Sequence, residues 1–487
     1  MTPTDPSVAP EASRAGPSST WDDGCPCPGP PRKSISSRMV RIRPFNADHI
    51  APPPSRSLAL RLRGPGERAV RDGHPWVFEG SVRSVDGSGP TPTAGDVGVV
   101  FDRKGRFLAA GLYDPDDVVR LRILAMGTPT RVGRALFVQR LQEALQRRAP
   151  LMSPDGGASG RMVTDGFRVV NGEGDGLPGV IVDRYGDTVV LKLYSAAWLP
   201  RLRDLIPAMV EALAPASLVG LVSRRVGAHP LCPDELRMGA LLHGADPGSA
   251  VPFRENGFTL EAHPLEGHKT GFYLDQRENR QRVEDEARRL AGERGSLRAL
   301  NVFSYSGGFS LYAARGGLAG VDGVSGGGPT PGGAVEVVSV DTAGPALRQA
   351  RRHFALNQAE LGQALHRTVE GDAFQILDGM TGEEGAFHLI ILDPPSFATR
   401  KEQRDGALAA YGRLTRAALP LLAPGGTLVQ ASCSSRVEPE AFYRVIRRSV
   451  LESGRRLEGE ARWGHALDHP IGLPEGEYLK CLFGTVS

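Results

Sequence analysis

A carboxylate and a thiol each follow an apolar run in the C-terminal part of the chain. Asp393-Pro394-Pro395-Ser396-Phe397 comes directly after the run 389–392, and Ser432-Cys433-Ser434 follows the run 427–430. A parallel strand buried on both faces has this continuous apolar pattern, and open α/β sheets bind ligands beyond the carboxyl ends of their strands. We therefore expect Asp393 and Cys433 at the ends of two adjacent strands, an arrangement that suits methyl transfer to a carbon atom of a nucleobase.

Upstream, a glycine turn and two acids follow three further predicted strands. The first strand ends at Asn301-Val302-Phe303, and the turn Ser304-Tyr305-Ser306-Gly307-Gly308 then begins a helix. Glycines at such a turn let a ligand approach the backbone N–H groups of the helix start. Asp341 ends the next strand, where it can bond two ribose hydroxyls, and Asp372 ends the third, where it can reach an adenine amine. Either acid could instead cap the helix that follows it.

Together these features indicate an adenosine-containing cofactor. The turn lacks the complete G-x-G-x-x-G pattern of a nicotinamide enzyme and the Gly-Lys-Ser/Thr of an ATPase, so S-adenosylmethionine is the best fit. The two prolines after Asp393 fix φ and remove N–H donors. The region around Pro394 would then form an exposed wall against which a flat base can lie.

Length, charge and cysteine content limit the class of protein. The 487 residues are too many for one ordinary core, so two or three domains are expected, and the net charge of +3 is compatible with nucleic acid without indicating it. The five cysteines, at 25, 27, 232, 433 and 481, lack zinc-ligand spacing, so neither a disulfide framework nor a metal site is expected. The chain has no apolar stretch of membrane-spanning length and no signal-peptide pattern, which predicts a cytoplasmic protein without membrane contact.

Four segments differ in composition. Residues 1–54, rich in Pro, Ser, Gly and Asp, are expected to be disordered, with Met39 as an alternative start. Residues 55–127 contain short apolar runs between turns, the pattern of a small β-rich domain. Residues 128–265 combine a helix, a linker at 151–160 and an α+β domain. Residues 266–487 alternate strands and helices, which predicts a doubly wound, mostly parallel α/β sheet interrupted by a glycine-dense loop between 320 and 333.

The motifs of residues 58–487 resemble those of PUA-containing class I methyltransferases that make 5-methylcytosine in large-subunit ribosomal RNA. In chain order they are Gly73-His74-Pro75-Trp76-Val77-Phe78, Asp175-Gly176-Leu177-Pro178-Gly179, Gly267-His268-Lys269-Thr270-Gly271-Phe272-Tyr273-Leu274-Asp275-Gln276-Arg277, Phe303-Ser304-Tyr305-Ser306-Gly307-Gly308-Phe309, Asp393-Pro394-Pro395-Ser396-Phe397, Ser432-Cys433-Ser434, Asp468-His469-Pro470 and Pro474-Glu475-Gly476. The glycine-dense loop and the N-terminal tail depart from the family's pattern, but neither contains a motif.

The resemblance implies a PUA-like RNA-binding domain, an α+β insert and a Rossmann-like catalytic domain. It also implies S-adenosylmethionine as the cofactor and ribosomal RNA as the partner. The oligomeric state is left open, and a homodimer is compatible with the sequence.

The resemblance further implies that a thiolate adds to C6 of cytosine, so that C5 can take the methyl group, and that loss of the C5 proton expels the thiol. Cys433 is the implied nucleophile, and Asp393 would hold the base edge at N3 or N4. Without the resemblance, Cys433 would fit a buried structural cysteine. Related enzymes of another RNA cytosine class have a second cysteine directly after the two prolines. Ser396 stands there in this chain, so the base that removes the C5 proton is not identified.

The other expected site residues come from the glycine turn, the strand-end acids and the resemblance. Those expected to bind the cofactor are Tyr273, Asp275, Phe303, Ser304, Tyr305, Gly307, Gly308, Asp341, Asp372 and Asp393. Those expected to bind substrate are Lys269, Arg277, Pro394 and Pro395, with Gln276 lining the same cleft. Alternatively, Asp275 and Arg277 simply begin a helix that also contains Arg280.

In the β-rich domain, the sequence offers basic and aromatic candidates for RNA contacts. Phosphate contacts are expected from Arg61, Arg63, Arg71 and Lys104. Trp76 and Phe78 could stack on bases, but their alternation along a strand fits a core role better.

Two other functions remain open on the sequence. Enzymes that methylate an exocyclic amine or a glutamine amide also have Asp-Pro-Pro-hydrophobic loops, but their chemistry needs no thiol. A non-catalytic RNA-binding protein could retain the same fold as a scaffold, and it would then fail to bind S-adenosylmethionine.

Overall fold

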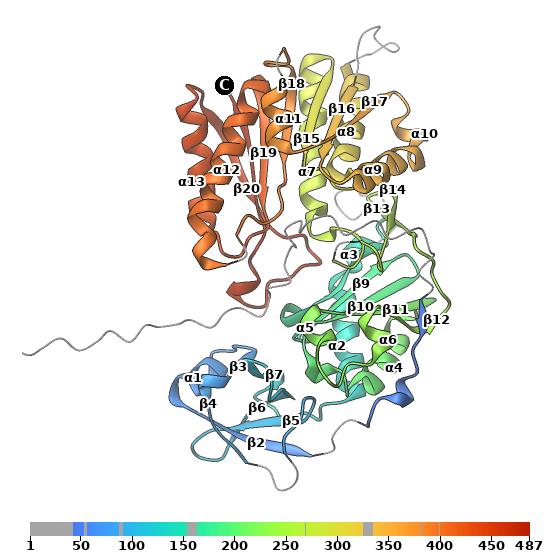
Figure 1. The fold of residues 1–487 in the computed structure, drawn as a ribbon, viewed down its shortest axis with the longest axis vertical. Coiled ribbons are helices and arrows are strands. Elements are labelled where there is room, and N and C mark those ends of the chain that lie inside the picture. Colours follow the sequence, from blue (N-terminus) through green and yellow to red (C-terminus); the bar gives the residue numbers. More distant parts are fainter. Residues whose placement is uncertain are drawn as a thin grey trace, which may run out of the picture.

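The structure is a computed structural model that describes residues 42–52, 56–86, 91–152, 163–267, 269–324, 335–380, 382–398 and 400–487. Three domains follow one another along the chain (Figure 1). The predicted disorder of residues 1–41, the alternative start at Met39, most of the linker 151–160 and the later part of the glycine-dense loop lie outside the described residues. Within the described ranges, no helix has the length and apolar character needed to cross a bilayer.

The first domain is a six-stranded sheet with one helix, as the alternating pattern predicted. The sheet has the order β3-β7-β6-β5-β2-β4. Leu60, Val100 and Leu121 are fully buried between the strands and α1 and form the centre of its core. The bounds are β2 Ser57–Leu62, α1 Gly64–Arg71, β3 Trp76–Phe78, β4 Val82–Asp86, β5 Val97–Phe101, β6 Phe107–Tyr113 and β7 Val119–Met126.

The second domain is the expected α+β unit, with a sheet of order β1-β12-β11-β10-β9-β8. Its first strand corrects the prediction of a disordered tail to residue 54, because β1 pairs in parallel with β12. On one face α2 packs against α4, where Phe137 meets Trp198 at a ring distance of 5.2 Å. The bounds are β1 Arg43–Pro44, α2 Arg134–Arg147, α3 Ala149–Met152, β8 Gly166–Asn171, β9 Val180–Tyr185, β10 Thr188–Leu193, α4 Leu202–Leu213, β11 Ser217–Val222, α5 Arg224–Gly227, α6 Asp234–Arg237 and β12 Ala240–Gly244.

A hairpin of β13 (Val251–Glu255) and β14 (Phe258–Ala262) joins the second and third domains. β13 contacts β8 and β9, whereas β14 contacts α9 (Gly344–Leu356) of the third domain. Phe253 and Phe258 lie in one apolar cluster with residues of both domains. The predicted boundary at 265 is therefore not a break in packing, because the two domains share a continuous core.

The third domain contains the predicted doubly wound sheet, with strand order β17-β16-β15-β18-β19-β21-β20. The first five strands in this order pair in parallel, and β21 is antiparallel to β19. Leu389 and Ile391 face one apolar cluster and Ile390 and Leu392 face the other, so β18 is buried on both faces. The bounds are α7 Arg277–Arg294, β15 Leu297–Val302, α8 Gly308–Val324, β16 Val335–Asp341, α10 Gln358–Leu361, β17 Ala364–Glu370, α11 Ala373–Gly379, β18 Phe387–Leu392, α12 Arg404–Ala418, β19 Leu422–Ser432, α13 Pro439–Glu452, β20 Leu457–Trp463 and β21 Lys480–Val486.

Two local predictions in this domain were wrong. The sequence predicts a turn at Pro424-Gly425-Gly426 before the strand at 427–430, whereas β19 begins at Leu422 and includes these residues, with a register shift opposite Phe387. α8 extends to Val324 and so includes the start of the expected glycine-dense loop. The glycines there serve helix packing, because a Cβ at Gly316 would lie 2.1 Å from the Glu284 backbone oxygen of α7, and one at Gly320 would lie 2.3 Å from that of Arg288.

Asp468 joins the second and third domains through a buried set of hydrogen bonds. Its carboxylate accepts bonds from Arg277 at 2.9 Å and from the Arg168 backbone N–H at 2.8 Å. Its carbonyl oxygen accepts a bond from Arg148 at 2.8 Å, and Arg148 also pairs with Asp175. Burial opposes ionisation, yet Arg277 and His469 hold the pKa of Asp468 well below its usual range. A buried charge with such partners is costly to leave unpaired.

Trp76 joins all three domains. It is 3% exposed, it packs with Val119 and with Leu473 of the third domain, and its indole N–H donates to Glu173 of the second domain at 2.8 Å. Phe78 packs beside it, at a ring distance of 6.0 Å. Both aromatic residues therefore have the core role favoured by the sequence, in a core that lies at a domain junction.

We expect Asp468→Asn to lower the free energy of unfolding by about 3 kcal/mol, because it removes one charge of a buried pair and leaves Glu278 as the carboxylate that still bonds Arg277. Thermal and urea denaturation would measure the effect. Asp48→Asn is the control, since Asp48 is exposed and pairs with Arg203 at 3.4 Å, and its cost should stay below about 1 kcal/mol. Equal losses in the two variants would show that Asp468 does not stabilise the domain junction.

Candidate active site

The turn between β15 and α8 has an unusual backbone. Phe303, Tyr305 and Gly307 have φ values of 62°, 46° and 77°. Positive φ is uncommon for residues other than glycine and persists only where surrounding contacts enforce it. At position 307 glycine is also required by packing, because a Cβ there would lie 2.8 Å from Cβ of Ala350 in α9.

Hydrogen bonds from neighbouring elements enforce this conformation. Asp341, at the end of β16, accepts bonds from the backbone N–H groups of Tyr305 and Ala343, both at 2.8 Å. His353 Nδ1 donates to the Ser306 carbonyl at 2.9 Å, while its Nε2 accepts the Glu261 N–H at 3.1 Å. Burial lowers the pKa of His353 to about 4, which keeps the ring neutral, as these two bonds require.

The turn has polar groups suited to an adenosine cofactor. The hydroxyl of Ser304 is buried and has no hydrogen-bond partner within the described part of the chain. Such a group is normally satisfied, so it fits a site that a polar ligand completes. Asp341 retains lone pairs beyond the two bonds it accepts. The turn also begins α8, whose first N–H groups favour an electronegative ligand.

Asp372 has the capping role that the sequence left open. It is the N-cap of α11, and its Oδ1 accepts the N–H groups of Phe374 and Gln375, both at 3.1 Å. This contact occupies one carboxylate oxygen, so the cofactor contact expected of Asp372 stays a prediction.

Asp393 lies at the end of β18 beside the start of α7. The Gln276 Nε2 donates to its Oδ2 at 3.1 Å, and the Asn279 Nδ2 donates to the Gln276 Oε1 at 2.7 Å. Both amide side chains are buried. The bond from Asn279 fixes the orientation of the Gln276 amide, so that its N–H faces Asp393. Asn279 was not among the predicted site residues.

The Asp393 and Cys433 loops are adjacent, as predicted, because β18 pairs in parallel with β19. The Ser396 and Ser434 hydroxyls, one from each loop, both donate to the Ala398 carbonyl at 2.9 Å. Cys433 is half-buried. One expectation was wrong: Pro394 is buried rather than exposed, and it is Pro395 that is partly exposed.

The segment before α7 brings Lys269, Tyr273 and Asp275 together. Lys269 Nζ donates to Asp275 at 2.5 Å and lies 4.5 Å from the centre of the Tyr273 ring, which in turn meets the Tyr305 ring of the glycine turn at 5.0 Å. Tyr478 also donates to Asp275, at 2.8 Å. Burial raises the pKa of Asp275, but the charge of Lys269 outweighs this effect and keeps the pKa below its usual range. Its second carboxylate oxygen, Oδ1, is buried and has no partner among the described residues.

Arg277 is not at an open surface. It is 1% exposed, it begins α7, and its guanidinium bonds Asp468 and Glu278. These contacts fit the alternative that Arg277 begins a helix. They give it a structural role, and the substrate contact expected of Arg277 stays a prediction.

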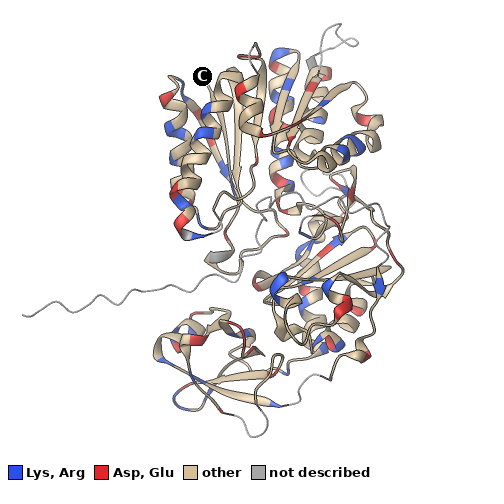
Figure 2. Cartoon of the chain, in the orientation of Figure 1, with Lys and Arg blue, Asp and Glu red and all other residues tan. Residues whose placement is uncertain are grey.

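The basic residues predicted to contact phosphates already have intramolecular partners in three of four cases. Arg61 and Arg63 donate to backbone carbonyls, and Arg71 pairs with Glu67 and Asp102. Lys104 is exposed. Lys and Arg residues are distributed over the described parts of all three domains (Figure 2). RNA contact by these four residues therefore stays a prediction.

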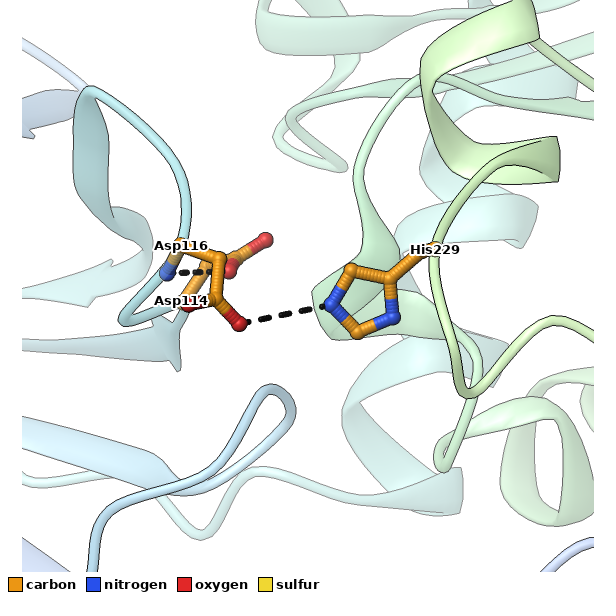
Figure 3. Close-up of side chains that lie close together, drawn as sticks. All are labelled: Asp114, Asp116 and His229. Atoms are coloured by element: carbon orange, nitrogen blue, oxygen red, sulfur yellow. Dashed lines mark hydrogen bonds and ion pairs between the residues drawn. The ribbon is translucent and has the colours of Figure 1, made fainter.

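Asp114, Asp116 and His229 lie together where the first domain meets the second (Figure 3). The His229 Nε2 is 3.5 Å from Asp116 Oδ2. Next to them, Asp117 pairs with Arg122 at 2.9 Å and with Arg225 at 3.0 Å. The pair of Asp117 with Arg225 of α5 joins the two domains, and these two guanidinium groups place positive charge beside the cluster.

Family models match two parts of the chain. Residues 60–126 match a PUA-like domain, and residues 240–453 match an S-adenosylmethionine-dependent methyltransferase. Among solved structures, a protein from Streptococcus mutans named as a SAM-dependent methyltransferase aligns with 88% of this chain and 99% of its own, at a TM-score of 0.65 and 18% identity. A second methyltransferase structure, complexed with SAH, aligns over the same shares at a TM-score of 0.66. These likenesses establish the fold.

Relatives of known name match over nearly their whole length. A "Ribosomal RNA large subunit methyltransferase" of Deinococcus radiodurans is 46% identical over 426 residues, which cover 88% of this chain and 97% of that protein. A "Ribosomal RNA large subunit methyltransferase I" of Vibrio parahaemolyticus is 32% identical over 430 residues, 87% of this chain and 98% of that protein. The chain therefore belongs to the family of S-adenosylmethionine-dependent ribosomal RNA large subunit methyltransferases that contain a PUA-like domain.

Proposed function

We propose that this protein is a cytoplasmic enzyme that transfers a methyl group from S-adenosylmethionine to C5 of a cytosine in large-subunit ribosomal RNA, through a covalent adduct with Cys433. The family membership supports the cofactor and the RNA class. The observation that supports the cysteine chemistry is the junction of the Asp393 and Cys433 loops at the Ala398 carbonyl. It holds a thiol beside a carboxylate at one edge of the sheet, next to the candidate cofactor turn.

In this proposal the residues of the chain have separate tasks. The Cys433 thiolate adds to C6 of the base, and Asp393 bonds the base edge at N3 or N4 as charge develops on the ring. Pro395 offers a partly exposed ring surface for the flat base. The bound cofactor supplies the methyl group, which C5 accepts. Loss of the C5 proton then restores the ring and breaks the bond between sulfur and C6.

The cofactor would lie against the turn of Phe303, Ser304, Tyr305, Gly307 and Gly308. The buried Ser304 hydroxyl and the free lone pairs of Asp341 are the polar groups available to it there. Tyr273 packs on Tyr305 and would close the site from the side of α7. Lys269 and Asp275 hold Tyr273 and Tyr478 in place around the same opening.

Replacing Cys433 with alanine should abolish methylation at C5, because Cys481, the other described cysteine of the third domain, is fully buried and burial and Asp393 raise its pKa well above the ordinary value. Bisulfite sequencing of ribosomal RNA would measure this methylation. The RNA would come from a deletion strain complemented with wild type or with Cys433→Ala. The matched control is Cys232→Ala, a buried cysteine of the second domain, which should restore methylation. Full activity of Cys433→Ala would favour methylation of an exocyclic amine or an amide, and an unchanged methylation map in the deletion strain would remove the proposal.

Replacing Gln276 with leucine should lower kcat roughly 10- to 100-fold, because Asp393 loses the N–H donor that orients it and a hydrogen bond to a charged group is broken. The affinity for S-adenosylmethionine, measured by calorimetry, should change much less. Gln281→Leu, one turn further along α7, is the control and should leave kcat within about twofold. A wild-type kcat for Gln276→Leu would show that this bond does not orient Asp393 for the reaction.

A further inference from the structure

Lys480 is a buried lysine next to the candidate nucleophile. It is the first residue of β21, it lies opposite Ser432 in the pairing of β19 with β21, and it is 3% exposed. Lysine is almost never buried to this degree unless its charge is compensated. In the described part of the chain, Lys480 forms no ion pair with a carboxylate. Its position therefore requires another explanation.

The ammonium group holds the loop that contains Cys433. Lys480 Nζ donates to the Ser434 carbonyl at 2.5 Å and to the Val437 carbonyl at 2.8 Å. An ammonium group has three N–H donors, so one remains after these two bonds. The same loop is held on its other side by the Tyr411 hydroxyl, which bonds the Ser432 hydroxyl at 2.8 Å. The backbone around Cys433 is thus fixed from two elements.

Lys480 and Cys433 interact electrostatically. Burial lowers the pKa of Lys480 to about 8, and a Cys433 thiolate would raise it, so each charge favours the other. Burial raises the pKa of Tyr411 and of Tyr478, which keeps both neutral near pH 7. Burial lowers the pKa of His465 to about 4, so this ring adds no charge. Among the described residues, other charged groups of this region are the carboxylates of Asp393, Glu438 and Glu477, the ammonium of Lys269, 5.8 Å from the Tyr478 ring, and Arg436 in the Cys433 loop.

We propose that Lys480 is a positioning residue that fixes the loop around Cys433 and stabilises the thiolate form of this cysteine. The ionisation breaks the S–H bond, leaves the electron pair on sulfur and releases the proton to water. The thiolate is then available for addition to C6, a step that rests on the proposed function. The effect should be largest below about pH 8, where Lys480 is charged, and should fade as the pH rises and Lys480 loses its proton.

The test is the rate at which iodoacetamide alkylates Cys433, followed by peptide mass spectrometry between pH 5 and 10 in the full-length protein. In the wild type, the apparent pKa of Cys433 should lie below the ordinary value of about 8.5. Lys480→Gln should raise it by roughly one unit or more and slow alkylation at pH 7 about tenfold. Lys480→Arg keeps the charge and should recover most of the wild-type rate. Arg448→Gln, at an exposed arginine of α13 that pairs with Glu452, should have no effect.

Several outcomes would overturn the inference. One is a measured pKa of Cys433 at or above 8.5 in the wild-type protein, a result that does not depend on whether any variant folds. Another is an unchanged alkylation profile in Lys480→Gln that retains its circular dichroism and cofactor affinity. A third is equal shifts in Lys480→Arg and Lys480→Gln, since charge would then not be the cause. Alkylation measures the thiolate without any methyl transfer. The inference about Lys480 can therefore hold even if Cys433→Ala disproves the covalent mechanism.

Discussion

The parallel pairing of β18 with β19 decides where the reactive groups of this protein can lie. Since Leu392 is opposite Gln430 and both strands run in the same direction, the loops that follow them leave the sheet at the same edge. Asp393 and Cys433 are in these loops, and a shared bond to the Ala398 carbonyl joins the two. The turn after β15 reaches the same edge, because β15 pairs in parallel with β18. One pairing pattern therefore brings together the candidate cofactor turn, the carboxylate and the thiol.

Buried charges connect this edge to the second domain. Gln276 contacts Asp393, and the next residue, Arg277, is held by Asp468, which also bonds the backbone of Arg168 in β8. The start of α7 is therefore fixed on one side by the site and on the other by the second domain. A shift between the two domains would move Gln276 and hence Asp393. The second domain thus supports the geometry of the site through the bond of Arg168 to Asp468.

The features that the sequence predicted well depend on local patterns. The apolar runs located β18 and the end of β19. The contacts of Gln276 with Asp393 and of Lys480 with Ser434 could not be predicted, because the partners lie far apart along the chain, at separations of 117 and 46 residues. The only feature of the sequence that could have indicated a buried lysine was the position of Lys480 within the otherwise apolar run 479–483. The glycines of α8 led to the wrong prediction of a loop. Glycine favours loops in a local pattern, but Gly316 and Gly320 here allow close contact between α8 and α7.

The central claim is that Cys433 forms a covalent bond to C6 of a cytosine, and an RNA substrate containing 5-fluorocytidine tests it most directly. Fluorine at C5 cannot leave as a proton does, so a methylated adduct could not release the enzyme. Mass spectrometry after digestion should then show a Cys433 peptide heavier by the methylated fluorocytidine nucleotide, formed only when S-adenosylmethionine is present. Turnover that leaves Cys433 unmodified, with the methyl group on an exocyclic nitrogen, would contradict the account.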